Sequence, residues 1–416
     1  MLPNLPELLS FGTILGLLTN PLATLRGSDR QQQQQQQQQN ALATAGASGV
    51  SLPFFASLER TSRLVDITYC VGTAGVSPPF SCPSRCADFP TLHLLQTWHT
   101  GLLLSDSCGY IAVDHGDDPA IIVAFRGTYS LTNTVVDLST VPQAYVPYPS
   151  PDDDDQLDTC ANCTVHAGFL ASWRNAREMV LPALRTARAM HPRHPVHLVG
   201  HSLGGAVAAL AALELRLALR WPDMRVTTFG EPRVGNAALA DYMDRAFGLA
   251  GNGPAGEGRL YRRVTHRGDP VPLLPLAEWG YRPHAGEVFI AKADLQPSPA
   301  DLRLCRGGSD PECSGGAEVG GRRRWGGLVD SLVRTLRRQD EDEGEEDDGD
   351  GARDTGLVPV RFRLWQLLFA HRDYFWRLGL CVPGGDPTDW GRKKYKVDWP
   401  RPGQPGREGV STGDEL

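Results

Sequence analysis

The sequence lacks both an apolar run long enough to cross a membrane and an excess of basic charge. The N-terminal apolar stretch Leu8–Leu18 is far shorter than the roughly 20 residues that a transmembrane helix needs. Lys and Arg number 41 against 48 Asp and Glu, which gives a net charge of -7. Nine of these carboxylates lie in Asp340–Asp350, and without them the chain would carry about +2. We therefore expect no transmembrane span and no nucleic-acid partner.

The sequence also lacks the repeated CxxC pairs of a zinc ribbon, although it has nine cysteines. Few histidines lie near the closely spaced cysteines, which disfavours a metal cluster. Disulfides in an oxidising compartment are the better interpretation. The short spacings are Cys82/Cys86, Cys160/Cys163 and Cys305/Cys313.

The two ends of the chain bear on its compartment. Leu8–Leu18 has the length of a signal-peptide core, but Glu7 precedes it without any Lys or Arg, and Pro21 lies badly for cleavage after Ala23. An uncleaved anchor or a loose tail is the alternative. The final residues Gly413–Leu416 (GDEL) resemble a KDEL-type retrieval signal, or are a chance acidic ending. We expect the secretory pathway, with the protein either extracellular or retained in the lumen of the endoplasmic reticulum.

Composition divides the chain into three parts. Residues 1–53 hold the apolar segment, the homopolymer Gln31–Gln39 and a linker. Residues 54–383 are expected to form one folded domain, interrupted at 314–356 by a Gly-rich and then strongly charged insertion. Like charges at that density repel, so we predict that this insertion is disordered. Residues 384–416 form a tail rich in Pro and Gly.

Alternating strand-like and helix-like segments within the domain predict an α/β fold. Ala120–Phe125 (AIIVAF) is a continuous apolar run, typical of a strand covered on both faces. Leu203–Leu219, rich in Ala and Leu, is expected to form a single helix. Further strands are predicted at Val196–Val199, Arg225–Phe229, Leu260–Thr265 and Val288–Ala291.

The strongest chemical signal is G-x-S-x-G at Gly200, Ser202 and Gly204, between a predicted strand and a predicted helix. A nucleophilic serine must project from a sharp turn, where larger flanking residues would collide with neighbouring backbone. The helix N-terminus also offers unpaired N–H groups beside it. A glycine-rich turn is the alternative, but we expect the nucleophile elbow of an α/β-hydrolase fold, with a mostly parallel central sheet and helices on both faces.

A serine nucleophile needs a base and an orienting acid, which follow it in the order acid and then histidine in this fold. Asp269 follows the predicted strand Leu260–Thr265 and is the candidate acid, although it could simply form a Gly-Asp-Pro turn. The histidines after it are His284 and His371. The residues alone favour His371 only slightly.

Several separated motifs make the chain resemble the fungal class 3 lipases, secreted triacylglycerol lipases of the α/β-hydrolase fold. The resemblance covers roughly Thr61–Cys381. It implies that Asp269, in Asp-Pro-Val-Pro, is the acid and that His371, in His-Arg-Asp-Tyr-Phe, is the base. His284 then takes a structural position. The motifs are Val123–Thr128, Val165–Phe169, the elbow, Phe229–Gly235 and the Asp269 loop.

The oxyanion hole and the lid follow from the elbow and from this resemblance. The backbone N–H of Leu203, directly after the nucleophile, is one expected donor. The resemblance implies that Thr128 supplies the second. It also implies a lid at Ser130–Leu138, where the apolar face consists of Leu131, Val135 and Leu138. Family lids often carry Trp where this chain has Thr134, and a plain surface helix is the alternative.

The cysteines also fit the resemblance, which implies a long-range disulfide between Cys70 and Cys381, ten residues past His371. Such a bridge would hold the His371 segment against the domain. The local pairs would be Cys82–Cys86, Cys160–Cys163 and Cys305–Cys313, which leaves Cys108 as a buried thiol in or beside a strand.

The expected function is hydrolysis of carboxylic esters of lipids in two acyl-transfer steps, without a metal or an organic cofactor. The expected partners are a lipid ester and, transiently, a lipid interface. Alternatives are an esterase for soluble or feruloyl-type esters, a phospholipase A1, or a catalytically inactive lipid-binding homologue, since a fold does not guarantee activity.

Overall fold

The computed structural model describes residues 49–101, 107–128, 142–148, 160–249, 256–316, 369–391 and 394. The predicted lid residues Leu131, Val135 and Leu138 lie outside these ranges. The same is true of most of the acidic insertion and of both ends of the chain. Among the described residues, no helix combines the length and apolarity required to cross a membrane.

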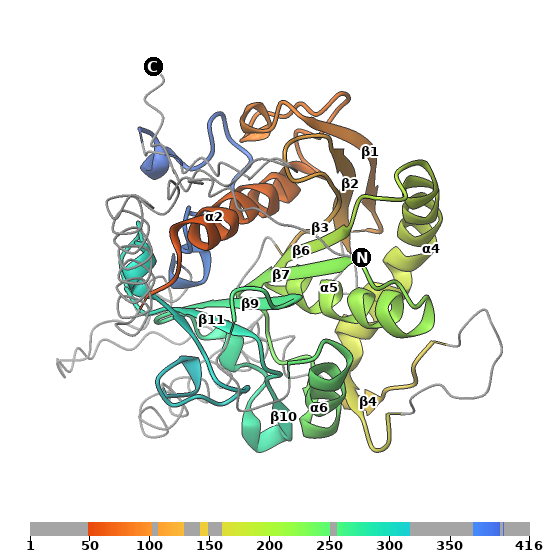
Figure 1. Ribbon diagram of the computed structural model, residues 1–416, viewed down its shortest axis with the longest axis vertical. Coiled ribbons are helices and arrows are strands. Elements are labelled where there is room, and N and C mark those ends of the chain that lie inside the picture. The colour runs from red at the N-terminus through yellow and green to blue at the C-terminus, as the bar shows by residue number, and fades with distance from the viewer. Residues whose placement is uncertain are drawn as a thin grey trace, which may run out of the picture. The chain divides into compact units, whose positions relative to one another are not determined.

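A twisted sheet of eight strands in the described chain forms the centre of the domain (Figure 1). The central strands β3, β6, β7, β9 and β11 are parallel, whereas β1, β2 and β12 add antiparallel pairs at the edges. The mostly parallel sheet predicted from the sequence is therefore confirmed. In sheet order the strands are β1 (Leu92–His99), β2 (Cys108–Asp114), β3 (Ala120–Phe125), β6 (Val196–His201), β7 (Met224–Phe229), β9 (Tyr261–His266), β11 (Glu287–Ile290) and β12 (Leu302–Leu304).

The segments that connect elements of the main sheet form a second, antiparallel sheet of short strands. Its strand order is β10 (Tyr281–Arg282), β8 (Gly235–Asn236), β5 (Thr164–His166) and β4 (Pro142–Ala144).

Helices cover both faces of the main sheet (Figure 1). On one face lies α2 (Leu52–Ile67); on the other lie α4 (Ala167–Met190), α5 (Leu203–Leu213) and α6 (Ala237–Ala246). Strand alternation sends Ile121, Val123 and Phe125 of β3 into the core beneath α4 and α5, and Ile122 and Ala124 into the core beneath α2. Because both faces are covered, β3 is apolar throughout, as its sequence predicted.

The helix predicted at Leu203–Leu219 is shorter than expected. The α-helix ends at Leu213 and continues as a π-turn at Glu214–Ala218. Within this turn the buried Glu214 accepts hydrogen bonds from Trp173 Nε1 (2.9 Å) and Arg177 Nε (2.8 Å) of α4. The wider turn coincides with this tertiary contact, which the Ala- and Leu-rich pattern does not reveal.

A C-terminal segment, residues 369–391, packs beside α2 (Figure 1). Buried polar contacts fasten it. Trp376 Nε1 donates to Glu59 (2.5 Å), and the N–H of Gly379 donates to Asp66 (2.9 Å). Arg85 connects Asp66 to Asp389 and lies over the ring of Trp376.

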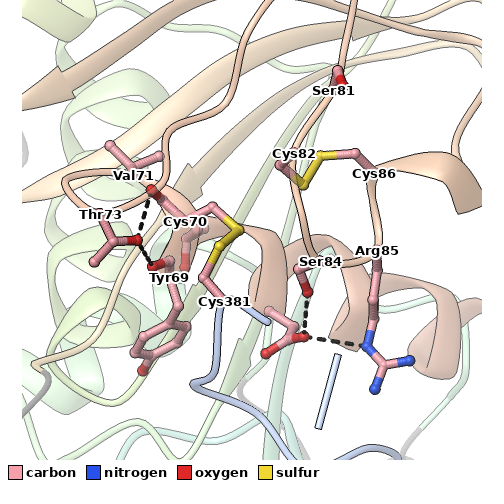
Figure 2. Close-up of a disulfide and its surroundings, with 12 residues drawn as sticks. Tyr69, Cys70, Val71, Thr73, Ser81, Cys82, Ser84, Arg85, Cys86 and Cys381 are labelled. Atoms are coloured by element: carbon pink, nitrogen blue, oxygen red, sulfur yellow. Dashed lines mark hydrogen bonds and ion pairs between the residues drawn. A yellow bond between two sulfur atoms is a disulfide. The ribbon is translucent and has the colours of Figure 1, made fainter. Parts of the chain in front are cut away.

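A disulfide between Cys70, at the end of the 3-10 turn Thr68–Cys70 that follows α2, and Cys381 completes this attachment (Figure 2). The other bridges are Cys82–Cys86, Cys160–Cys163 and Cys305–Cys313, so all four pairs expected from the sequence are present. Cys108 lies buried at the first residue of β2, outside these bridges.

Candidate active site

Ser202 lies on a sharp turn between β6 and α5. Its backbone angles, φ 57° and ψ -129°, are unfavourable for a residue with a side chain. The turn is fixed because the N–H of Ser202 donates to the carbonyl of Phe229 at the end of β7 (2.9 Å), while the carbonyl of Ser202 accepts from the N–H of Gly205 (2.8 Å). The strand, strained turn and helix are the arrangement that the motif predicted.

The glycines beside Ser202 are required by close backbone contacts. A Cβ at Gly200 would lie 2.3 Å from the carbonyl oxygen of Gly204, and a Cβ at Gly204 would lie 2.4 Å from that of Phe125. The loop after β3 also approaches the turn, because a Cβ at Gly127 would lie 3.0 Å from Ser202 Cβ. Of the two expected oxyanion-hole residues, Thr128 follows Gly127 directly and Leu203 follows Ser202.

Asp269 and His371 meet although 102 residues separate them in sequence. The Nδ1 of His371 lies 2.9 Å from both carboxylate oxygens of Asp269, and both side chains are buried. Asp269 also accepts a hydrogen bond from the N–H of Val271 (2.9 Å). With Nδ1 held by the carboxylate, the opposite ring atom, Nε2, is the one available for proton transfer.

The serine and the histidine lie on either side of the β7 terminus. The N–H of Ser202 donates to the carbonyl of Phe229, and the next residue, Gly230, has φ +58° and leaves no room for a side chain beside the imidazole. A Cβ at Gly230 would lie 2.7 Å from His371 Cε1. Ser202 Oγ and His371 Nε2 are both buried, and neither has a hydrogen-bond partner among the described residues. Two unsatisfied polar atoms are thus brought to one region of the protein interior.

His201, next to the nucleophile, supports the position of His371. Its Nε2 lies 2.9 Å from the backbone carbonyl of His371, its Nδ1 lies 2.6 Å from the hydroxyl of Tyr69, and its ring stacks on that of His371. Burial, together with the neighbouring His371, lowers the pKa of His201 well below the usual histidine value. A neutral ring here adds no like charge to the one that would develop on His371.

Tyr374 is a site residue that the sequence analysis did not single out. Its hydroxyl donates to Asp269 Oδ2 at 2.5 Å, on the carboxylate that also holds His371. Burial, followed by the charge of Asp269, raises the pKa of Tyr374 well above its usual value, so it remains a donor. Its place in the His-Arg-Asp-Tyr-Phe motif, three residues after His371, was the available signal.

His284 occupies a separate buried group. Its Nε2 lies 2.8 Å from Glu231, which also accepts hydrogen bonds from Thr228 (2.6 Å) and Tyr261 (2.7 Å). Burial opposes ionisation of Glu231, but the adjacent His284 and its hydrogen bond lower the pKa of that carboxyl overall. His284 is thus paired with Glu231, in the loop that begins at Gly230.

Solved structures share the fold that carries these residues. The crystal structure of the Lip2 lipase from Yarrowia lipolytica superimposes with a TM-score of 0.63 at 28% identity, covering 80% of this chain and 97% of that one. The protein described here therefore has the α/β-hydrolase fold.

Sequence comparison gives the family. The sequence model of the class 3 lipases matches residues 122–279. The secreted mono- and diacylglycerol lipase 2 of Gibberella zeae is 58% identical over 367 residues, covering 84% of this chain and 87% of that protein. Lipase A of Sodiomyces alcalophilus is 53% identical, covering 94% and 96%. The chain belongs to the class 3 lipase family and is a carboxylic-ester hydrolase that acts on lipid esters.

Proposed function

We propose that Ser202, His371 and Asp269 form the catalytic triad of this lipase. The observation that carries the proposal is the contact of His371 Nδ1 with Asp269, because it leaves Nε2 to act as the base on the serine side. His371 would take the proton of Ser202 as its oxygen attacks the ester carbonyl, and would then return the proton to the departing alcohol. Water would hydrolyse the acyl-enzyme by the same route. Asp269 would hold the tautomer and stabilise the imidazolium.

The backbone N–H groups of Leu203 and Thr128 would stabilise the tetrahedral oxyanion. Leu203 begins α5, so its N–H is at the positive end of a helix and has no partner within that helix. Thr128 is supported by the approach of Gly127 to Ser202. Each such donor contributes roughly 10²–10³ to the rate in hydrolases of this kind.

As substrate class we propose mono- and diacylglycerols. The support is similarity to the Gibberella zeae enzyme, and the secreted mono- and diacylglycerol lipase A of Penicillium cyclopium is 36% identical over 205 residues. The same names support secretion. Transient binding to a lipid interface is part of the proposal, because the substrates gather there.

The test compares hydrolysis of emulsified monoolein, diolein and triolein with that of a dissolved butyrate ester and of a phospholipid. We expect the partial glycerides to be hydrolysed fastest, and Ser202→Ala to abolish all activity. Faster hydrolysis of the phospholipid or of the soluble ester would refute the substrate class. Activity that survives in Ser202→Ala would refute the triad.

A further inference from the structure

A group of histidines lies at the ends of the central strands opposite the end that carries Ser202. His115 follows β2, in the turn that leads to β3, whereas His191 and His194 lie between α4 and β6. Since β3 and β6 run parallel, these residues precede the strands whose carboxyl ends carry Thr128 and Ser202. The mechanism proposed above uses none of them.

One ring nitrogen from each of the three histidines can be chosen so that all three atoms lie within 4.8 Å of one another. The rings approach without stacking flat: the centroids of His115 and His191 are 5.4 Å apart, and those of His191 and His194 are 5.1 Å apart. A fourth imidazole, His93 of β1, lies 5.2 Å from His115. His194 Nε2 is buried and has no hydrogen-bond partner among the described residues.

The backbone fixes the relative positions of these side chains. The N–H of His115 donates to the carbonyl of Thr91 (3.0 Å), and the N–H of His194 donates to the carbonyl of His191 (3.0 Å). Pro192 and Pro195 each follow one of the latter histidines, and proline restricts the backbone around it. Because the backbone is already fixed, ion binding has to order only the side-chain torsions of the histidines.

We propose that His115, His191 and His194 form a binding site for a divalent transition-metal ion of the zinc class. Neutral imidazole is a preferred ligand of Zn²⁺, Ni²⁺ and Cu²⁺, whereas Ca²⁺ and Mg²⁺ prefer oxygen. Metal–nitrogen bonds of about 2.0–2.1 Å in a tetrahedral site place ligand atoms about 3.4 Å apart. The three ring nitrogens lie within 4.8 Å of one another, so their side chains would have to rotate inward when the ion binds.

Such an ion would join the β2–β3 turn to the end of α4 and would stabilise the folded state, since an ion that binds only the folded chain shifts the unfolding equilibrium. The site is remote from Ser202, so its loss should leave ester hydrolysis unchanged. Metal binding and ester hydrolysis can therefore be measured independently, and a failure of one does not affect the other.

The test is calorimetric titration of the untagged, full-length protein with Zn²⁺. We expect one saturable site, weakened at least about tenfold in His191→Ala and in His194→Ala. Zn²⁺ should raise the thermal midpoint of the wild type but not of the double variant. His99→Gln is the matched control, because His99 is an exposed histidine outside this group.

Unchanged binding in His191→Ala and His194→Ala would overturn the proposal, and so would an equal loss in His99→Gln. Hydrolysis of the butyrate ester at the wild-type rate checks that each variant is folded. The visible spectrum of Co²⁺ provides a second measurement: bands typical of nitrogen coordination should appear in the wild type and disappear in His115→Gln.

Discussion

Tyr374 donates its hydroxyl to the Asp269 carboxylate, so this buried acid holds both the tyrosine and His371. Tyr374 and His371 come from one short segment, which follows a long stretch of chain outside the described residues. The position of the proposed base therefore depends on how residues 369–391 are attached to the domain. Four predictions test this dependence and the surroundings of the site.

Tyr374→Phe should leave Asp269 with one hydrogen bond fewer. A lost hydrogen bond to a buried charge costs about 1–3 kcal/mol in the free energy of unfolding, and we expect kcat to fall roughly tenfold as the carboxylate loses its orientation. KM should stay unchanged, because Tyr374 is proposed to act through Asp269. Urea denaturation and steady-state kinetics measure these effects.

Tyr281→Phe is the control for that experiment, since the buried Tyr281 hydroxyl has no hydrogen-bond partner in the described part of the chain. It should change neither stability nor kcat appreciably. Equal effects of the two substitutions would argue against a specific role for the Tyr374 hydroxyl.

Gly230→Ala should displace His371. The added methyl group would lie 2.7 Å from His371 Cε1, and a misplacement of about 1 Å can cost 10²-fold in rate. Gly248→Ala is the matched control: Gly248 also has a positive φ, of 63°, but no atom lies within 4 Å of its Cβ position. Both variants carry similar backbone strain, whereas only Gly230→Ala adds a clash with His371. We therefore expect kcat on the butyrate ester to fall in Gly230→Ala and to stay unchanged in Gly248→Ala. Comparable losses would refute steric displacement.

Loss of the Cys70–Cys381 disulfide should affect both stability and catalysis. Its removal is expected to cost about 2–5 kcal/mol, and the freed segment should lower kcat because it carries His371. Replacement of both cysteines by Ser, with stability and kcat measured on one preparation, is the experiment. The pair Cys305/Cys313, replaced likewise, closes a much shorter loop and should cost less stability with kcat unchanged. A larger loss of stability or of kcat in the Cys305/Cys313 variant than in the Cys70/Cys381 variant would contradict this role of the long-range disulfide.

The buried His197 and His201 should make the protein sensitive to acid. Burial, assisted for His197 by Arg225, lowers the pKa of both well below 6.5. Below about pH 6.5 these histidines are therefore protonated in the unfolded chain but remain neutral in the folded chain. Because the unfolded state binds more protons, the free energy of unfolding decreases as the pH falls. Each histidine contributes a limiting slope of about 1.4 kcal/mol per pH unit. His197→Gln should flatten the curve between pH 6.5 and 5, and His99→Gln should not. An unaltered curve in the first variant would exclude His197 as a source.

The elbow and the strands around it could be predicted from the sequence because their signals are local. Ala120–Phe125 was predicted with the observed bounds, and the turn at Ser202 follows from its two glycines. The other predicted central strands differ by one or two residues at their ends.

Contacts distant in sequence were less accessible. The sequence alone barely separated His371 from His284, because the difference lies in which carboxylate each meets: Asp269 or Glu231. The roles of Tyr69 and Tyr374, and the attachment of residues 369–391 through Arg85, depend on tertiary packing that no local pattern encodes. The π-turn at Glu214 has the same origin.

The most direct test of the proposed triad is labelling of the full-length protein with a fluorophosphonate, followed by peptide mass spectrometry. The account predicts a single adduct on Ser202, absent from Ser202→Ala and formed far more slowly in His371→Ala. An adduct on another residue, or unchanged labelling in His371→Ala, would contradict it.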